Sequence, residues 1–232
     1  MPARVYPQAV SRRSLIYLHG FASSPRSSKA RLFAERAAAA GIAFACPDLN
    51  EPEFRTLTVS RMIDSVERAI ADLPEGPIAL AGSSLGAFVA LHAAARRSGA
   101  REDRRPIDRL IFLAPALDLV PGFEREVGPD QIRSWQATDA YTVFHYSDNQ
   151  PRELAWAFME DARRYDAFAV SLPIPTLIYQ GRRDEVVAPD AVERWAASRP
   201  WVTLLLVDDG HQLLDHVEQM WSDIRRIVEG GE

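Results

Sequence analysis

Short apolar runs alternate with amphipathic stretches along most of this chain. Residues 15–18 and 78–81 are apolar runs of the length typical of buried strands. Between such runs, apolar residues recur at helical spacing, as in Val59, Met62 and Val66. This alternation predicts an α/β fold, in which a mostly parallel central sheet lies between two layers of helices as a three-layer sandwich.

The same pattern places the individual elements. Strands are expected at residues 15–18, 42–46, 78–81, 110–114, 176–179 and 201–207. Thr58 is suited to cap the start of one helix, and Pro74 to end it. Pro189 suits the first position of a later helix.

The strand–helix rhythm breaks once, between about residues 118 and 172. This insert is rich in aromatic residues, and Trp135 and Phe144 are candidates for selecting a substrate. We expect a cap over the C-terminal edge of the sheet, helical from residue 151 to about 163. An ordinary excursion with its own small core is the alternative. The prediction is therefore a single domain over residues 1–232, with residues 118–172 as a cap or lid insertion.

A candidate nucleophile lies at the end of the third strand. Residues 82–86, Gly-Ser-Ser-Leu-Gly, match the pattern G-x-S-x-G between a strand and a helix, as a nucleophile elbow requires. Glycines allow the close backbone approach of such a turn. The turn would project the Ser84 hydroxyl above the sheet edge and leave the Leu85 N–H free to stabilise an oxyanion.

A serine hydroxyl needs a base to take its proton. The candidates are His19, His92, His145, His211 and His216. His92 lies eight residues beyond Ser84 on the same helix, about 12 Å along its axis, and is expected to be a packed or surface residue. His19 is expected to make a structural hydrogen bond. His211 follows the last strand, at the sheet edge where Ser84 is expected, so it is the predicted base.

The imidazole in turn needs a carboxylate. Asp184 follows the strand at residues 176–179 and is the predicted acid, with Asp118 as its rival. Asp208 and Asp209 are expected to be turn residues on a wet loop, and Asp48 to anchor its own loop.

The second oxyanion donor is expected in the loop after the first strand. The Phe21 N–H, in His19-Gly20-Phe21, is the candidate. A single glycine follows His19, so this loop is not of the HGGG type.

At this point the chain resembles the α/β-hydrolase superfamily over nearly its whole length. Residues 18–25 and 82–86 look like the small bacterial esterases of the YqiA type, and residues 82–94 also resemble mitochondrial depalmitoylating thioesterases. Residues 181–189 and 210–211 match the acid and histidine loops of the superfamily.

The resemblance implies the same roles as the residues themselves. It gives Ser84 as nucleophile, Asp184 as acid, His211 as base, and Phe21 and Leu85 as oxyanion donors. The antiparallel strand pair that often opens this fold has little room before Ser14, so we expect a sheet of six or seven strands.

The expected function is a serine esterase or thioesterase that cleaves carboxylic esters or thioesters of small to medium acyl groups. Its partner would be a small-molecule substrate. A peptidase of the same fold and a ligand-binding receptor on a hydrolase scaffold are the alternatives.

Composition limits the possible partners, cofactors and location of the protein. The net charge is −5, so the basic footprint of a nucleic-acid-binding protein is absent. The longest apolar run, residues 37–46, is far shorter than the roughly 20 residues of a membrane span. Cys46 is the only cysteine, which excludes an intrachain disulfide and a thiolate metal cluster. We therefore expect a cytoplasmic protein without metal or organic cofactor, and the oligomeric state stays open.

Overall fold

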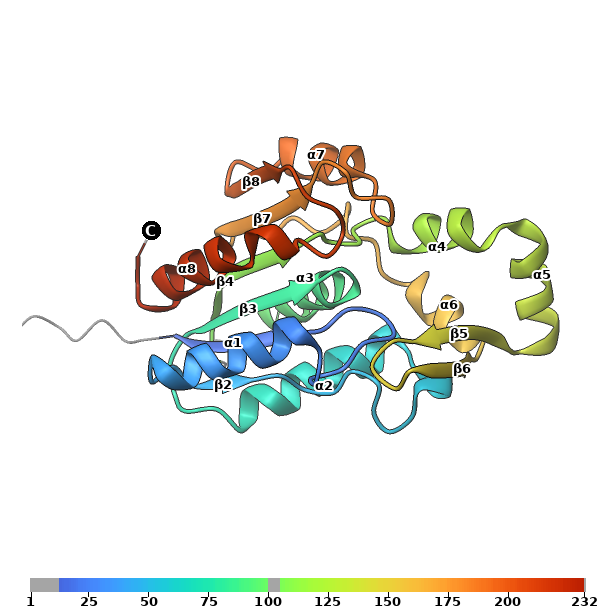
Figure 1. The fold of residues 1–232 in the computed structure, drawn as a ribbon, viewed down its shortest axis with the longest axis horizontal. Coiled ribbons are helices and arrows are strands. Elements are labelled where there is room, and N and C mark those ends of the chain that lie inside the picture. Colours follow the sequence, from blue (N-terminus) through green and yellow to red (C-terminus); the bar gives the residue numbers. More distant parts are fainter. Residues whose placement is uncertain (1–12, 100–104, 232) are drawn as a thin grey trace, which may run out of the picture.

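The computed structural model describes residues 13–99 and 105–231, and a parallel sheet of six strands forms its centre (Figure 1). The strands are β1 (Ser14–Leu18), β2 (Phe44–Ala45), β3 (Ile78–Ser83), β4 (Ile107–Leu113), β7 (Thr176–Gly181) and β8 (Val202–Val207). Their order is β2-β1-β3-β4-β7-β8, and every pairing is parallel. The predicted α/β class and the expected six or seven strands are confirmed for the described residues.

Helices cover both faces of this sheet, as predicted (Figure 1). On one face, α1 (Ser28–Ala39) and α8 (Val217–Val228) pack against alternate strand residues. On the other face lie α2 (Val59–Ala71), α3 (Leu85–Ser98) and α7 (Pro189–Ala197). Within the described ranges, no helix has the length and apolar character needed to cross a membrane.

The order of the strands determines where a site can form. From β1 the chain moves outward to β2 and then returns to place β3 on the other side of β1. Adjacent strands whose connections leave in opposite directions open a crevice at their carboxyl ends, where ligands of open α/β sheets bind. Leu18 at the end of β1 pairs with Gly82 in β3, so the loop after β1 lies beside the G-x-S-x-G turn.

Most predicted boundaries agree with the structure to within a few residues. The Thr58 side chain accepts a hydrogen bond from the Arg61 N–H and caps α2, which ends at Ala71, ahead of Pro74. β2 is shorter than expected, because only Phe44 and Ala45 pair with β1 at this edge of the sheet.

The segment between β4 and β7 differs from the sequence prediction. It contains α4 (Leu119–Val127), α5 (Pro129–Thr138), β5 (Tyr141–His145), β6 (Gln150–Leu154) and α6 (Ala157–Ala162). The helix expected over residues 151–163 is confirmed only for α6, because residues 150–154 instead pair antiparallel with β5. In Figure 1 the segment lies beyond the arrowheads of the sheet strands, at their carboxyl ends.

This inserted segment is fixed to the rest of the fold. Trp135 is fully buried, its indole N–H donates to the Leu154 carbonyl at 2.8 Å, and its ring packs on Trp156 and Phe158. In α6, the Asp161 carboxylate accepts both the backbone N–H and the hydroxyl of Ser60 at 2.7 Å, at the start of α2.

Candidate active site

Ser84 occupies a strained turn between β3 and α3. Its φ is 52° and its ψ is −117°, a conformation that costs a non-glycine residue about 1–3 kcal/mol. The flanking glycines make the turn sterically feasible. A Cβ on Gly82 would lie 2.5 Å from the Ala87 amide nitrogen, and one on Gly86 would lie 2.6 Å from the His19 carbonyl oxygen. The sequence thus places Ser84 at the carboxyl end of β3, where it is partly exposed among buried neighbours.

The loop after β1 borders this serine. A Cβ on Gly20 would lie 3.6 Å from the Ser84 Cβ, so the two backbones are in near contact. His19 braces the loop from within the core: its Nδ1 lies 2.9 Å from the Gly20 carbonyl oxygen, and its Nε2 accepts the Leu49 N–H at 3.0 Å. The expectation that His19 is structural is confirmed.

Two backbone donors near Ser84 have no acceptor among the residues that the structure describes. Within the described part of the chain, neither the Phe21 N–H nor the Leu85 N–H donates a hydrogen bond to another residue. Leu85 is the first residue of α3, where the helix dipole adds partial positive charge. Both donors are therefore available to an anionic group at Ser84.

His211 and Asp184 form a hydrogen-bonded pair. His211 Nδ1 lies 2.9 Å from Asp184 Oδ2 and 3.1 Å from Oδ1, and the Asp184 side chain is fully buried. Asp184 Oδ1 also accepts the N–H groups of Val186 and Val187, and Oδ2 accepts the side-chain amide of Gln180. Burial raises the pKa of Asp184, but the hydrogen bond and charge of His211, together with the Val187 and Gln180 donors, outweigh burial, so the pKa is lowered overall.

Asp209 shapes the loop that carries His211. Its carboxylate accepts the Gly210 N–H at 2.7 Å and the Asp215 N–H at 3.0 Å, and it lies 3.0 Å from His216 Nδ1. The expectation of a wet turn residue is wrong for Asp209, which is buried. It holds for Asp208, which is exposed and pairs with an arginine side chain. The glycine that follows Asp209 is the sequence feature that indicates this structural role, because an aspartate can accept a nearby backbone N–H in a local turn.

The structure separates the other candidates from this pair. Asp118 pairs with Arg125 in α4, and His92 packs between Phe88 and Tyr165. His216 is held by Asp209, and His145 lies in the hairpin of β5 and β6. Asp48 binds the backbone and side chain of Asn50 within its own loop, as expected.

Ser84 and His211 are not joined in this conformation. Among the residues that the structure describes, no hydrogen bond connects the Ser84 hydroxyl with the imidazole. Such contacts are often long without substrate and tighten when it binds. Ser84 follows β3, whereas Asp184 and His211 follow β7 and β8, and β4 lies between β3 and β7 in the sheet. The serine and the Asp184–His211 pair therefore lie at the same carboxyl end of the sheet as two separate parts.

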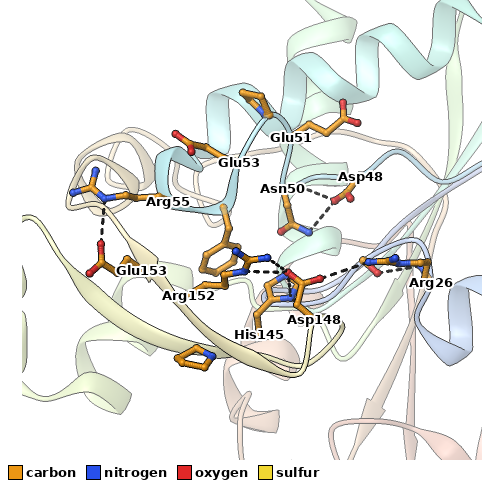
Figure 2. A pocket seen from close by; sticks show the side chains of 14 residues that line it. Arg26, Asp48, Asn50, Glu51, Glu53, Arg55, His145, Asp148, Arg152 and Glu153 are labelled. Atoms are coloured by element: carbon orange, nitrogen blue, oxygen red, sulfur yellow. Dashed lines mark hydrogen bonds and ion pairs between the residues drawn. The ribbon is translucent and has the colours of Figure 1, made fainter.

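A separate charged cleft of about 580 Å³ lies between the loop after β2 and the β5–β6 hairpin. Neither Ser84 nor His211 lines it. Figure 2 shows the side chains of Arg152 and Arg26 reaching Asp148 from two sides, at 2.9 Å and 3.5 Å. Within the described ranges, no three or more His, Cys, Asp or Glu side chains gather closely enough to hold a metal ion.

Comparison with solved structures shows an α/β-hydrolase fold. A candidate hydrolase from Agrobacterium vitis S4 is 26% identical with a TM-score of 0.81, over 94% of this chain and 88% of that chain. Mouse alpha/beta hydrolase domain-containing protein 10 is 22% identical with a TM-score of 0.73, over 93% and 89%. Est1E from Butyrivibrio proteoclasticus is 20% identical with a TM-score of 0.72, over 93% and 88%.

The two matches at lower identity show the fold alone. No curated protein sequence matches the chain. The uncharacterised protein family UPF0227 matches residues 14–227, in agreement with the resemblance to YqiA-type proteins. The chain is therefore a member of the UPF0227 family, built on the α/β-hydrolase fold.

Proposed function

We propose that this protein is a serine hydrolase that cleaves carboxylic esters or thioesters of small to medium acyl groups. The observation that carries the proposal is the strained conformation of Ser84. Its positive φ is maintained by a turn that excludes side chains at both flanking glycines, beside two N–H groups that have no acceptor within the described residues. Strain of this kind persists where it serves a function, and here it exposes a hydroxyl at a strand end.

The proposed reaction begins with attack of Ser84 Oγ on the substrate carbonyl. His211 Nε2 accepts the serine proton, while Nδ1 keeps its own proton in the hydrogen bond to Asp184. The Phe21 and Leu85 N–H groups stabilise the tetrahedral oxyanion. His211 then donates the proton to the leaving alcohol or thiol, and later activates the water that releases the acid. No step calls for a metal or an organic cofactor.

We further propose that the segment at residues 118–172 is the cap that selects the acyl group. Phe21, in the oxyanion loop, contacts Phe123 of α4 at 5.1 Å and Phe158 of α6 at 5.8 Å between ring centroids. The inserted helices therefore touch the loop that would bind the carbonyl. Trp135 is fully buried, so its role is in packing the cap, whereas Phe123 is only partly buried.

Turnover of an acyl-ester and acyl-thioester panel tests the proposal. Ser84→Ala should lower kcat by about 10⁴-fold or more on every substrate that the wild type cleaves. Ser98→Ala is the matched control, because Ser98 is exposed at the far end of the same helix. Saturable binding of esters without turnover would instead support a receptor, and activity that survives in Ser84→Ala would contradict the assignment.

A further inference from the structure

Lys29 is the only lysine of the chain, and it lies behind the candidate site. It belongs to the first turn of α1. Its Nζ donates to the Gln212 carbonyl oxygen at 3.0 Å and to the Ser83 hydroxyl at 3.3 Å. Ser83 directly precedes Ser84, and Gln212 directly follows His211. One side chain thus contacts the immediate neighbours of both residues.

The two contacts join parts of the fold that are otherwise held separately. Ser83 is the last residue of β3 in the middle of the sheet, whereas Gln212 lies in the loop after β8 at its edge. In the described conformation, no hydrogen bond runs directly between Ser84 and His211. The Lys29 contacts therefore supply a link between the two parts that does not need substrate.

The surroundings of the ammonium are polar but only partly compensate its charge. Asp209 and Asp184 act directly on the ammonium, and Tyr17 hydrogen-bonds its partner Ser83. Behind these groups, His216 and His211 pair with the two carboxylates, and Cys46 acts on Tyr17. Burial lowers the pKa of Lys29 to about 8, against the opposing attraction of Asp209 and Asp184. At neutral pH the amine is therefore mostly charged, and the charge is lost as pH rises through about 8.

We propose that Lys29 is a positioning residue, whose ammonium holds the turn of Ser84 and the loop of His211 in the relative placement that proton transfer requires. This inference rests on the proposed function. A charged donor makes a stronger hydrogen bond than a neutral one. Loss of the proton weakens both contacts and loosens the loop, so turnover declines at alkaline pH.

Kinetics of Lys29→Met and Lys29→Arg test this role. Misplacement of a reacting group by about 1 Å can cost about 10²-fold, so Lys29→Met should lower kcat roughly ten- to a hundred-fold with little change in KM. Its alkaline limb near pH 8 should disappear. Lys29→Arg keeps the charge at every accessible pH and should recover part of the rate, also without that limb. Arg31→Met, which removes an exposed cation two residues further along α1, should behave as wild type.

A second readout does not depend on turnover. With ¹³C in the lysine side chain, the single Lys29 signal should titrate near pH 8, and the Gln212 amide signal should move with it in wild type but not in Lys29→Met. A kcat for Lys29→Met equal to wild type with the alkaline limb retained, or a Gln212 signal indifferent to the titration, would overturn the inference. Undiminished activity in Ser84→Ala would instead overturn the proposed function and with it the positioning role, and the Lys29 contacts would then be structural only.

Discussion

Replacement of Asp184 by asparagine keeps the size of the side chain and changes one acceptor into a donor. Asp184 Oδ1 accepts two backbone N–H groups, from Val186 and Val187, at 2.9 and 2.8 Å. The asparagine carbonyl oxygen should keep these two bonds. Its NH₂ group then occupies the place of Oδ2, facing both His211 Nδ1 and the Gln180 amide.

This exchange reverses the imidazole tautomer. His211 Nδ1 must accept from the new NH₂ group, so the ring proton moves to Nε2, which can then no longer take the serine proton. By analogy with serine proteases, kcat should fall about 10⁴-fold, or about 5 kcal/mol of transition-state stabilisation. The fold should suffer less. Gln180 Oε1 has no partner among the described residues, so rotation of that amide supplies an acceptor for the new NH₂ group.

The assay is kcat for an acetyl ester, with urea unfolding of the same samples. We expect Asp184→Asn to lose less than about 2 kcal/mol of unfolding free energy, so the kinetic loss is not a loss of folded protein. Asp118→Asn is the matched control, since Asp118 pairs with Arg125 instead of a histidine. If Asp118→Asn abolished turnover while Asp184→Asn left it nearly unchanged, Asp184 would not be the acid.

Three further predictions concern the turn of Ser84, the buried His92 and the absence of a metal requirement. Gly86→Ala should lose about 3 kcal/mol in urea unfolding, because its Cβ meets the backbone after β1, whereas Gly99→Ala, whose Cβ would have no neighbour closer than 3.9 Å, should be nearly neutral. Burial lowers the pKa of His92 to about 4, so the stability of the neutral native form is present above about pH 6.5 and is lost as pH falls toward 4. Wild type should therefore lose up to about 3 kcal/mol over that window and His92→Leu should not, and equal slopes for both proteins would contradict this. Exhaustive chelation should leave ester turnover unchanged, and a loss restored by one metal ion would oppose the proposed mechanism.

The elements around Ser84 could be predicted because their signals are local. A strand, two glycines at fixed spacing and a helix lie within residues 78–98. The steric need for Gly82 acts within that stretch, since its Cβ would meet Gly86 and Ala87, whereas the need for Gly86 comes from the backbone of Leu18 and His19. Thr58 likewise caps a helix that it directly precedes. Signals of this kind depend on few residues, so they survive without knowledge of the tertiary structure.

The inserted segment could not be predicted with the same certainty. Residues 150–154 form an edge strand because β5 pairs with them, and their own sequence contains Pro151 and charged residues instead of an apolar run. The contacts of Lys29 are equally invisible in the sequence, because Gln212 lies 183 residues away. The burial of Asp209 does not follow from the sequence, because the approach of Gly181 to its backbone, which helps to bury this loop, is a tertiary contact.

Covalent labelling tests directly whether Ser84 is an activated nucleophile. A fluorophosphonate reacts with an activated serine, so intact-mass and peptide mass spectrometry of the treated protein report both the number and the position of adducts. We expect one adduct on Ser84, no labelling of Ser84→Ala, and slow labelling of Asp184→Asn because its histidine holds the wrong tautomer. An adduct on a different serine with Ser84 unmodified, or ester turnover by a protein that the probe never labels, would contradict it.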